Sequence, residues 1–186
     1  MGKPTEGVKL AYEALNLIRK PLDRDLVLED MAAMFTEIGL RDAARDTHLL
    51  LASTAQSKQV RQTATVNLME LAAQDEMPEA FDSYARELAS APMSAWLRSH
   101  YLLFLGEGMN RLGRHDAALE TLQEAVSFAD ANQIHQVSFQ AQAAVSAVRS
   151  SVPPKKFVPP PSWVPEEVGT VVRAISELRK TAVAAA

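Results

Sequence analysis

The stretch LGEGMNRLGRHDAALETLQEA, residues 105–125, decides the fold of this chain. Gly106 and Gly113 lie seven positions apart in it, and apolar residues recur around them at helical spacing. Gly113 stands where a helix ends, a place that favours a residue in the left-handed backbone conformation. Gly106 lies inside the same helix, where glycine costs roughly 1 kcal/mol relative to alanine. The stretch therefore predicts a helix, a turn and a second helix, with the role of Gly106 still to be explained.

The same helical spacing continues over most of residues 5–150, and no alternating pattern typical of a strand interrupts it. Eight helices are predicted there, at about residues 5–19, 24–38, 41–54, 58–73, 78–89, 95–112, 115–131 and 133–149. Asp23, Ser57 and Ser94 are expected as N-caps, and Pro78 as the first residue of its helix. The short turns between these helices predict antiparallel neighbours. We therefore expect an all-α fold whose first domain covers residues 1–150.

Composition changes after this domain. Residues 151–165 contain the sequence VPPKKFVPPPSWVP, whose prolines favour an extended polyproline path rather than a helix. We expect a linker here, with Phe157 and Trp163 as its anchors. The alternative is that an SH3- or WW-like partner binds this proline-rich segment.

The C-terminal piece, residues 166–186, is predicted to be an amphipathic helix. Its apolar stripe consists of Val168, Val171, Val172, Ile175 and Leu178. Such a stripe should not stay in water. We expect it to cap the last helix pair of the preceding domain, and the alternative is docking on another chain, including a second copy, to form a homo-oligomer.

Composition and motifs exclude several classes of protein. The 186 residues include no cysteine, which removes disulfides, thiol catalysis and cysteine metal sites. The chain has a net charge of −4, whereas nucleic-acid-binding domains usually carry an excess of basic residues. The four histidines show no metal-binding spacing, and no phosphate-binding loop or nucleophile motif is present. We expect no catalytic residue, metal or cofactor, hence no enzyme, and without a signal peptide or membrane anchor we expect a cytoplasmic location.

One helix pair carries a recognisable pattern of large and small side chains. Its members are Leu102, Leu105, Gly106, Met109, Gly113, Ala118, Leu122 and Ala125. The pattern resembles the tetratricopeptide repeat, in which small residues at the places of Gly106, Ala118 and Ala125 let two helices approach closely. Leu122 would fill the space beside them, and a side chain at Gly106 would push the paired helix away.

Two weaker copies precede this unit, so the resemblance covers about residues 24–150. Aligning Ala44, Ala80 and Ala118 gives intervals of 36 and 38 residues, against 34 in the standard repeat. The stretched form is similar to repeats of bacterial regulators and signalling ATPases. The resemblance implies an α-solenoid of antiparallel helix pairs, while a plain helical bundle with coincidental alanines is the alternative.

In the family, the first helix of each pair lines a concave groove that binds a protein or a peptide. The residues that the resemblance places in this groove are His100, Leu103, Glu107, Asn110 and Arg111 in the best unit, Gln62 and Met69 in the unit before it, and Gln136 and Gln140 in the last helix. This set differs from the groove residues of the family members that clamp a terminal carboxylate, since only Asn110 and Arg111 suit that role.

The function expected from this resemblance is a scaffold or adaptor that binds a protein or peptide partner. Two alternatives remain open at this point. The chain is otherwise a ligand- or peptide-sensing regulatory domain of a larger bacterial signalling or transcription protein, or a structural oligomer assembled through its C-terminal helix.

Overall fold

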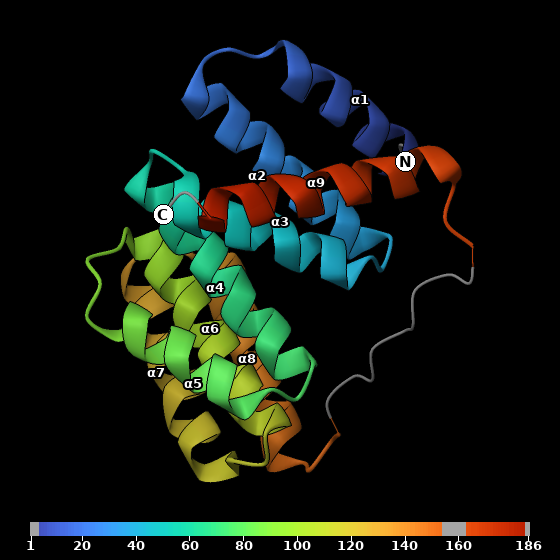
Figure 1. Cartoon of the computed structure of the whole chain (residues 1–186). Coiled ribbons are helices and arrows are strands. Elements are labelled where there is room, and N and C mark those ends of the chain that lie inside the picture. The colour runs from blue at the N-terminus through green and yellow to red at the C-terminus, as the bar shows by residue number, and fades with distance from the viewer. Residues whose placement is uncertain (1–3, 154–162, 185–186) are drawn as a thin grey trace. The chain divides into compact units, whose positions relative to one another are not determined.

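A computed structural model describes residues 4–153 and 163–184 of the chain (Figure 1). All regular structure in these two ranges is helical, and no strand occurs within them. The helices are α1 (Pro4–Leu17), α2 (Pro21–Glu37), α3 (Arg41–Thr54), α4 (Lys58–Gln74), α5 (Pro78–Ala89), α6 (Ala95–Arg111), α7 (His115–Ala131), α8 (His135–Arg149) and α9 (Glu166–Ala184). The expected all-α fold is therefore confirmed for this part of the chain. Most of the expected linker, including Phe157, lies outside the described residues.

The helix boundaries follow local chemistry, with one correction. Ser94 caps α6 as expected, because its hydroxyl accepts a hydrogen bond of 3.3 Å from the Leu97 amide. Asp23 was expected to cap α2, but that prediction is wrong, since the helix begins at Pro21. Proline is preorganised for the first helical position. Asp23 lies instead in the first turn, where a carboxylate suits the helix dipole.

The helices recur at a constant interval along the chain. α2, α4 and α6 begin at residues 21, 58 and 95 and are each 17 residues long. α3, α5 and α7 begin at residues 41, 78 and 115. Both series therefore repeat every 37 residues, which corrects the intervals of 36 and 38 that the sequence suggested. The correction places Phe81, rather than Ala80, at the position of Ala44 and Ala118.

One type of turn closes the first helix of each pair. Gly39, Glu76 and Gly113 adopt positive φ angles of 79°, 55° and 77°. The amide of the following residue donates to a carbonyl five positions earlier, as in the bond of 2.8 Å from Arg114 to Met109. This left-handed ending satisfies carbonyl groups that a helix leaves without partners. It also aims each second helix back along the first.

The described chain divides into two compact units. One contains α1–α3, the part of α4 up to Thr65, and α9, while the other contains the rest of α4 and α5–α8. In the first unit, α9 packs against α1 and α3 (Figure 1). We expected this helix to cap the last pair of the repeat, so its position on α1 and α3 is a correction. Of its stripe, Val168, Val171 and Ile175 are buried there.

The charged ends of α9 are held by the same two helices. Glu167 lies 3.5 Å from Lys9 of α1, and Arg179 lies 2.8 Å from Asp46 of α3. The apolar stripe and these ion pairs together explain why the C-terminal helix joins the first unit. Leu178 of the same stripe stays 37% exposed.

In the second unit, α6 packs on α7, and α7 packs on α8. Its apolar core brings together buried side chains of α4, α5, α6, α7 and α8. Arg114, at the turn before α7, forms a bidentate ion pair with Asp82 of α5, at 2.5 and 2.9 Å. Hydrogen bonding to Arg114 lowers the pKa of Asp82 below its ordinary value. This ion pair ties α5 to the helix pair that follows it.

Candidate functional site

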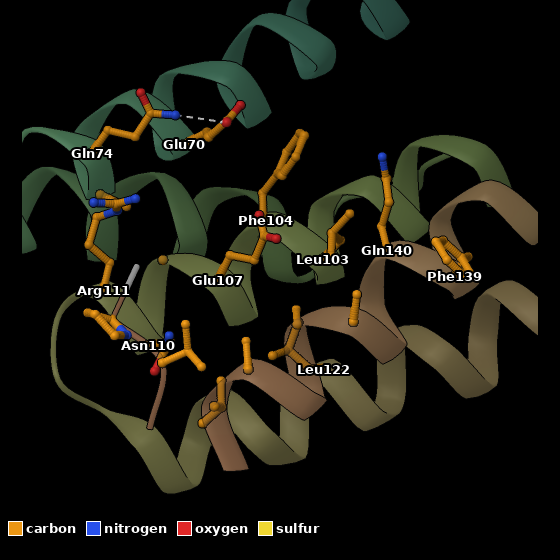
Figure 2. A pocket seen from close by; sticks show the side chains of 18 residues that line it. Glu70, Gln74, Leu103, Phe104, Glu107, Asn110, Arg111, Leu122, Phe139 and Gln140 are labelled. Atoms are coloured by element: carbon orange, nitrogen blue, oxygen red, sulfur yellow. Dashed lines mark hydrogen bonds between the residues drawn. The ribbon is translucent and has the colours of Figure 1, made fainter. Parts of the chain in front are cut away.

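A pocket of about 590 Å³ lies within the second unit (Figure 2). Three helices line it, namely α4, α6 and α8. They alternate with α5 and α7 along the chain. Leu122 of α7 also contributes, and Val152 and Pro153 complete the lining beyond α8. The pocket is therefore formed by equivalent helices rather than by one loop or one helix end.

The lining side chains of α4 and α6 occupy equivalent positions, 37 residues apart. Three such pairs line the pocket, namely Glu70 and Glu107, Ala73 and Asn110, and Gln74 and Arg111. Leu103 of α6 and Gln140 of α8 line it as well. The interval from α6 to α8 differs from 37, because α8 begins 40 residues after α6 and its closing left-handed residue, Ser151, follows Gly113 by 38. The interval that relates the boundaries of α4 and α6 thus also relates their residues at the site.

Small side chains explain why this space is hollow. The residues concerned are Ala73 of α4 and Ala143, Ala144 and Ala147 of α8. An alanine projects only one carbon from its helix, so neighbouring helices in contact still leave a space above their alanines. Most of these small residues come from α8, which makes that side of the pocket largely apolar.

Polar groups are concentrated on α4 and α6. The Gln74 amide donates a hydrogen bond of 2.9 Å to Glu70, which orients both side chains at the pocket (Figure 2). Asn110 Oδ1 lies 2.9 Å from His115 Nδ1, so the first turn of α7 orients the Asn110 side chain. With Glu107 and Arg111, these groups give the pocket both hydrogen-bond donors and acceptors.

Large apolar side chains lie at the pocket and remain in contact with water. Phe139 of α8 is 74% exposed and Val152 is 53% exposed. Figure 2 shows Phe139 and Gln140 on the α8 side and Glu70 and Gln74 on the α4 side. With the alanines of α8, Phe139 and Val152 give this side of the pocket an exposed apolar surface that a bound molecule could cover.

The structure brings together five of the residues that the resemblance placed in a groove. Leu103, Glu107, Asn110, Arg111 and Gln140 all line the pocket. His100, Gln62 and Gln136 are not among the lining residues. His100 instead places Nδ1 2.9 Å from the carbonyl oxygen of Trp96 on its own helix, and Gln62 belongs to the other unit.

Met69 was expected to face a partner, and this expectation is wrong. Its side chain is fully buried in the apolar core of the second unit. The cause is an error of one residue in the sequence alignment of the α4–α5 pair, since the 37-residue interval relates Glu107 to Glu70 and not to Met69. The same shift explains why Glu70 and Gln74 line the pocket although sequence reasoning missed them.

The small residues singled out for packing lie between α6 and α7. Gly106, Ala118, Leu122 and Ala125 are all buried. A Cβ atom added at Gly106 would lie 2.6 Å from Leu122 Cγ, closer than real contacts allow. The absence of a side chain at Gly106 therefore permits the contact between these two helices.

Gly108 has a similar role that sequence reasoning missed. A Cβ atom there would clash with the Phe81 ring of α5 and would lie 3.0 Å from Ala73 Cβ. Phe81 occupies the place that is Ala44 in the α2–α3 pair and Ala118 in the α6–α7 pair, and its ring needs the space above Gly108. A glycine two positions after Gly106 was the available signal for this contact.

No protein-family model, curated protein or solved structure matches this chain. Within the described ranges, no three potential metal-ligating side chains are gathered at one place. The helices of these ranges also include none with the length and apolar character needed to cross a membrane.

Proposed function

We propose that this chain is a tetratricopeptide-like repeat protein that binds a peptide segment of another protein in the pocket of α4, α6 and α8. The observation that carries the proposal is the equivalence of the lining residues of α4 and α6, the first helices of two consecutive pairs, with α8 lining the same pocket. A repeat protein that binds along a groove uses the same helical face of each repeat. In a plain helical bundle, equivalent rows of residues around one pocket have no reason to occur.

The packing of the repeats supports the same assignment. Helices of equal length recur every 37 residues, and each ends in the same left-handed turn. Gly106 permits the close contact between α6 and α7, which is the role of small residues in the family. The interval exceeds the standard 34 residues, so the chain is a stretched variant of the repeat.

The chemistry of the pocket suits a peptide. Its apolar floor offers burial to a side chain, and each buried methylene contributes about 0.8 kcal/mol. The amides of Gln74, Asn110 and Gln140 can bond to the carbonyl and amide groups of a peptide backbone. A scaffold or adaptor role follows from such binding, because the pocket holds a partner without changing it chemically.

Selection from a peptide library, displayed on phage and presented to the purified chain, tests this function. Selected peptides should shift the amide resonances of α4, α6 and α8 in nuclear magnetic resonance spectra. Ala143→Trp should abolish binding, since Ala143 is exposed and lines the pocket. Gln123→Trp, on an exposed position of α7 outside the pocket, is the matched control and should bind normally. Selected peptides that shift only other helices, or that bind Ala143→Trp equally well, would contradict the proposal.

A further inference from the structure

An aromatic strip adjoins the pocket, and the repeat pattern does not account for it. Trp96, His100 and Phe104 follow one another along α6 at intervals of four residues. The ring centroids of Trp96 and His100 are 4.0 Å apart, and His100 meets Phe104 edge to face at 6.1 Å. Because Phe104 also lines the pocket, the strip continues from the pocket toward the beginning of α6.

The equivalent positions of α4 hold no aromatic residue. They are Gln59, Thr63 and Asn67, 37 residues before the members of the strip. The strip is therefore a feature of this one helix and is not required by the packing of the repeat. Trp96 is 52% exposed, so its ring keeps a large area available for contact with a ligand.

The amide side chains of the pocket favour an extended ligand over a helical one. A polyproline helix makes no hydrogen bonds within its own backbone, so its carbonyl groups need external donors. Gln74, Asn110 and Gln140 carry such donors at the pocket. A helical ligand would already satisfy its backbone and would leave these amides without a specific role.

The charges of the second unit favour a basic ligand. On the pocket wall, Glu70 and Glu107 outnumber Arg111. Over residues 66–153 the chain has eleven carboxylate side chains and five arginines. An excess of one sign attracts a partner of the other sign and raises its association rate.

We infer that this groove binds an extended, proline-rich segment of another protein with lysine or arginine beside the prolines. Proline rings pack on the faces of aromatic side chains, and a polyproline helix loses little entropy on binding because it is already formed. Phe104 and Phe139 flank the apolar pocket, the strip to Trp96 extends the aromatic surface, and the two glutamates attract the basic residues. The inference specifies the ligand class of the proposed peptide-binding function and rests on that function.

Titration of the full chain with three fluorescein-labelled peptides tests the inference. The probe is KPPLPPKPP, and its controls are EPPLPPEPP, which reverses the charge, and KAALAAKAA, which removes the prolines. Fluorescence anisotropy should show the probe binding at least about tenfold more tightly than either control, the effect of losing one important contact. Raising the salt concentration should weaken binding of the probe, because screening reduces the attraction between exposed charges.

Exposed positions provide variants that keep the fold. Trp96→Ala and Phe139→Ala should each weaken probe binding about fivefold to tenfold, within the range of a single aromatic contact. Met77→Ala removes a side chain that is 49% exposed and lies outside the pocket, and it should leave binding unchanged. Circular dichroism of each variant checks that its helices are intact.

Each outcome bears on the inference. Equal affinity for the probe and either control, or full affinity in both aromatic variants, would overturn it. The proposed function is tested separately by the peptide library. Library peptides that bind in this groove but lack prolines or basic residues would reject the ligand class and keep the function, whereas a library without any groove ligand would reject both.

Discussion

Gly106 shows how one missing side chain sets the contact between two helices. A Cβ atom there would lie 2.6 Å from Leu122 Cγ and 3.3 Å from the Leu122 backbone nitrogen. We therefore expect Gly106→Ala to lower the free energy of unfolding by about 1–3 kcal/mol, as overpacking does elsewhere. Urea unfolding followed by circular dichroism measures this change.

Gly169 provides the matched control on α9. A Cβ atom there meets nothing closer than 3.7 Å, so Gly169→Ala should gain up to about 1 kcal/mol of helix propensity. Combining Gly106→Ala with Leu122→Ala should cost less than the sum of the two single changes, because the added methyl then occupies part of the cavity. If Gly106→Ala were as stable as the unchanged chain, the close contact would not exist.

His48 is a buried polar residue in the first unit. The residue is 5% exposed, and its Nδ1 atom has no hydrogen-bond partner among the described residues. The 37-residue interval relates it to Ala85 and Leu122, so an apolar position of the repeat here carries an imidazole. Burial lowers the pKa of His48 to about 4, which keeps the ring neutral at pH 7.

This pKa predicts a loss of stability in acid. The unfolded chain takes up a proton at His48 near pH 6.5, whereas the folded chain takes it up only near pH 4. His48 therefore does not reduce the free energy of unfolding above pH 6.5. As the pH falls from 6.5 toward 4, the free energy of unfolding decreases by about 3 kcal/mol on account of this residue. His48→Leu should remove this part of the pH dependence, measured as the difference between the two unfolding curves from pH 7 to 4. Parallel curves would show that His48 is not held neutral.

At the scale of the helix, the turns that end the first helices give the clearest contrast between sequence and structure. Gly39 and Gly113 are recognisable in the sequence, since glycine adopts positive φ without strain. Glu76 takes the same conformation, with φ of 55°, although nothing in its chemistry favours that angle. Because Glu76 does not signal such a turn in the sequence, the constant interval could not be recognised there, and the α4–α5 pair was aligned one residue out of place.

Most helix boundaries were predictable because breakers and caps are local. α3, α5 and α7 begin and end where the sequence placed them. The pocket was predictable only in part, because it depends on a register between helices that are distant in sequence. Phe81 stands where the other units have alanine, and the space that accepts it comes from Gly108 on another helix.

The strained turns predict stabilising substitutions. Glu76 and Gln133 are exposed and adopt φ angles of 55° and 59°, conformations that cost a non-glycine residue about 1 kcal/mol. Glu76→Gly and Gln133→Gly should each raise the free energy of unfolding by about this amount, and thermal unfolding measures it. Gln123→Gly, at an exposed position inside α7, should lower stability by a similar amount. Destabilisation in all three variants would contradict the assigned turn conformations.

At the scale of the whole molecule, the two ends of the chain belong to one unit. α9 buries Val168, Val171 and Ile175 against α1 and α3, more than 100 positions away in sequence. Sequence reasoning recognised that this stripe must be covered but not which helices cover it, because the stripe fits any apolar surface. The partner of an amphipathic helix is thus decided by the rest of the fold.

This arrangement predicts that damage to α9 spreads to the first unit and not to the second. Ile175 is fully buried, so Ile175→Asp places a carboxylate in an apolar contact at a cost of several kcal/mol. Hydrogen–deuterium exchange with mass spectrometry should show faster exchange throughout α1, α2, α3 and α9, while α6, α7 and α8 keep their protection. Leu178→Asp, three residues further along at a position that is 37% exposed, should change exchange only near its own turn. Faster exchange in α6–α8 of the Ile175→Asp variant would mean that the two units unfold together, and unchanged exchange in α1–α3 would mean that α9 does not complete the first unit.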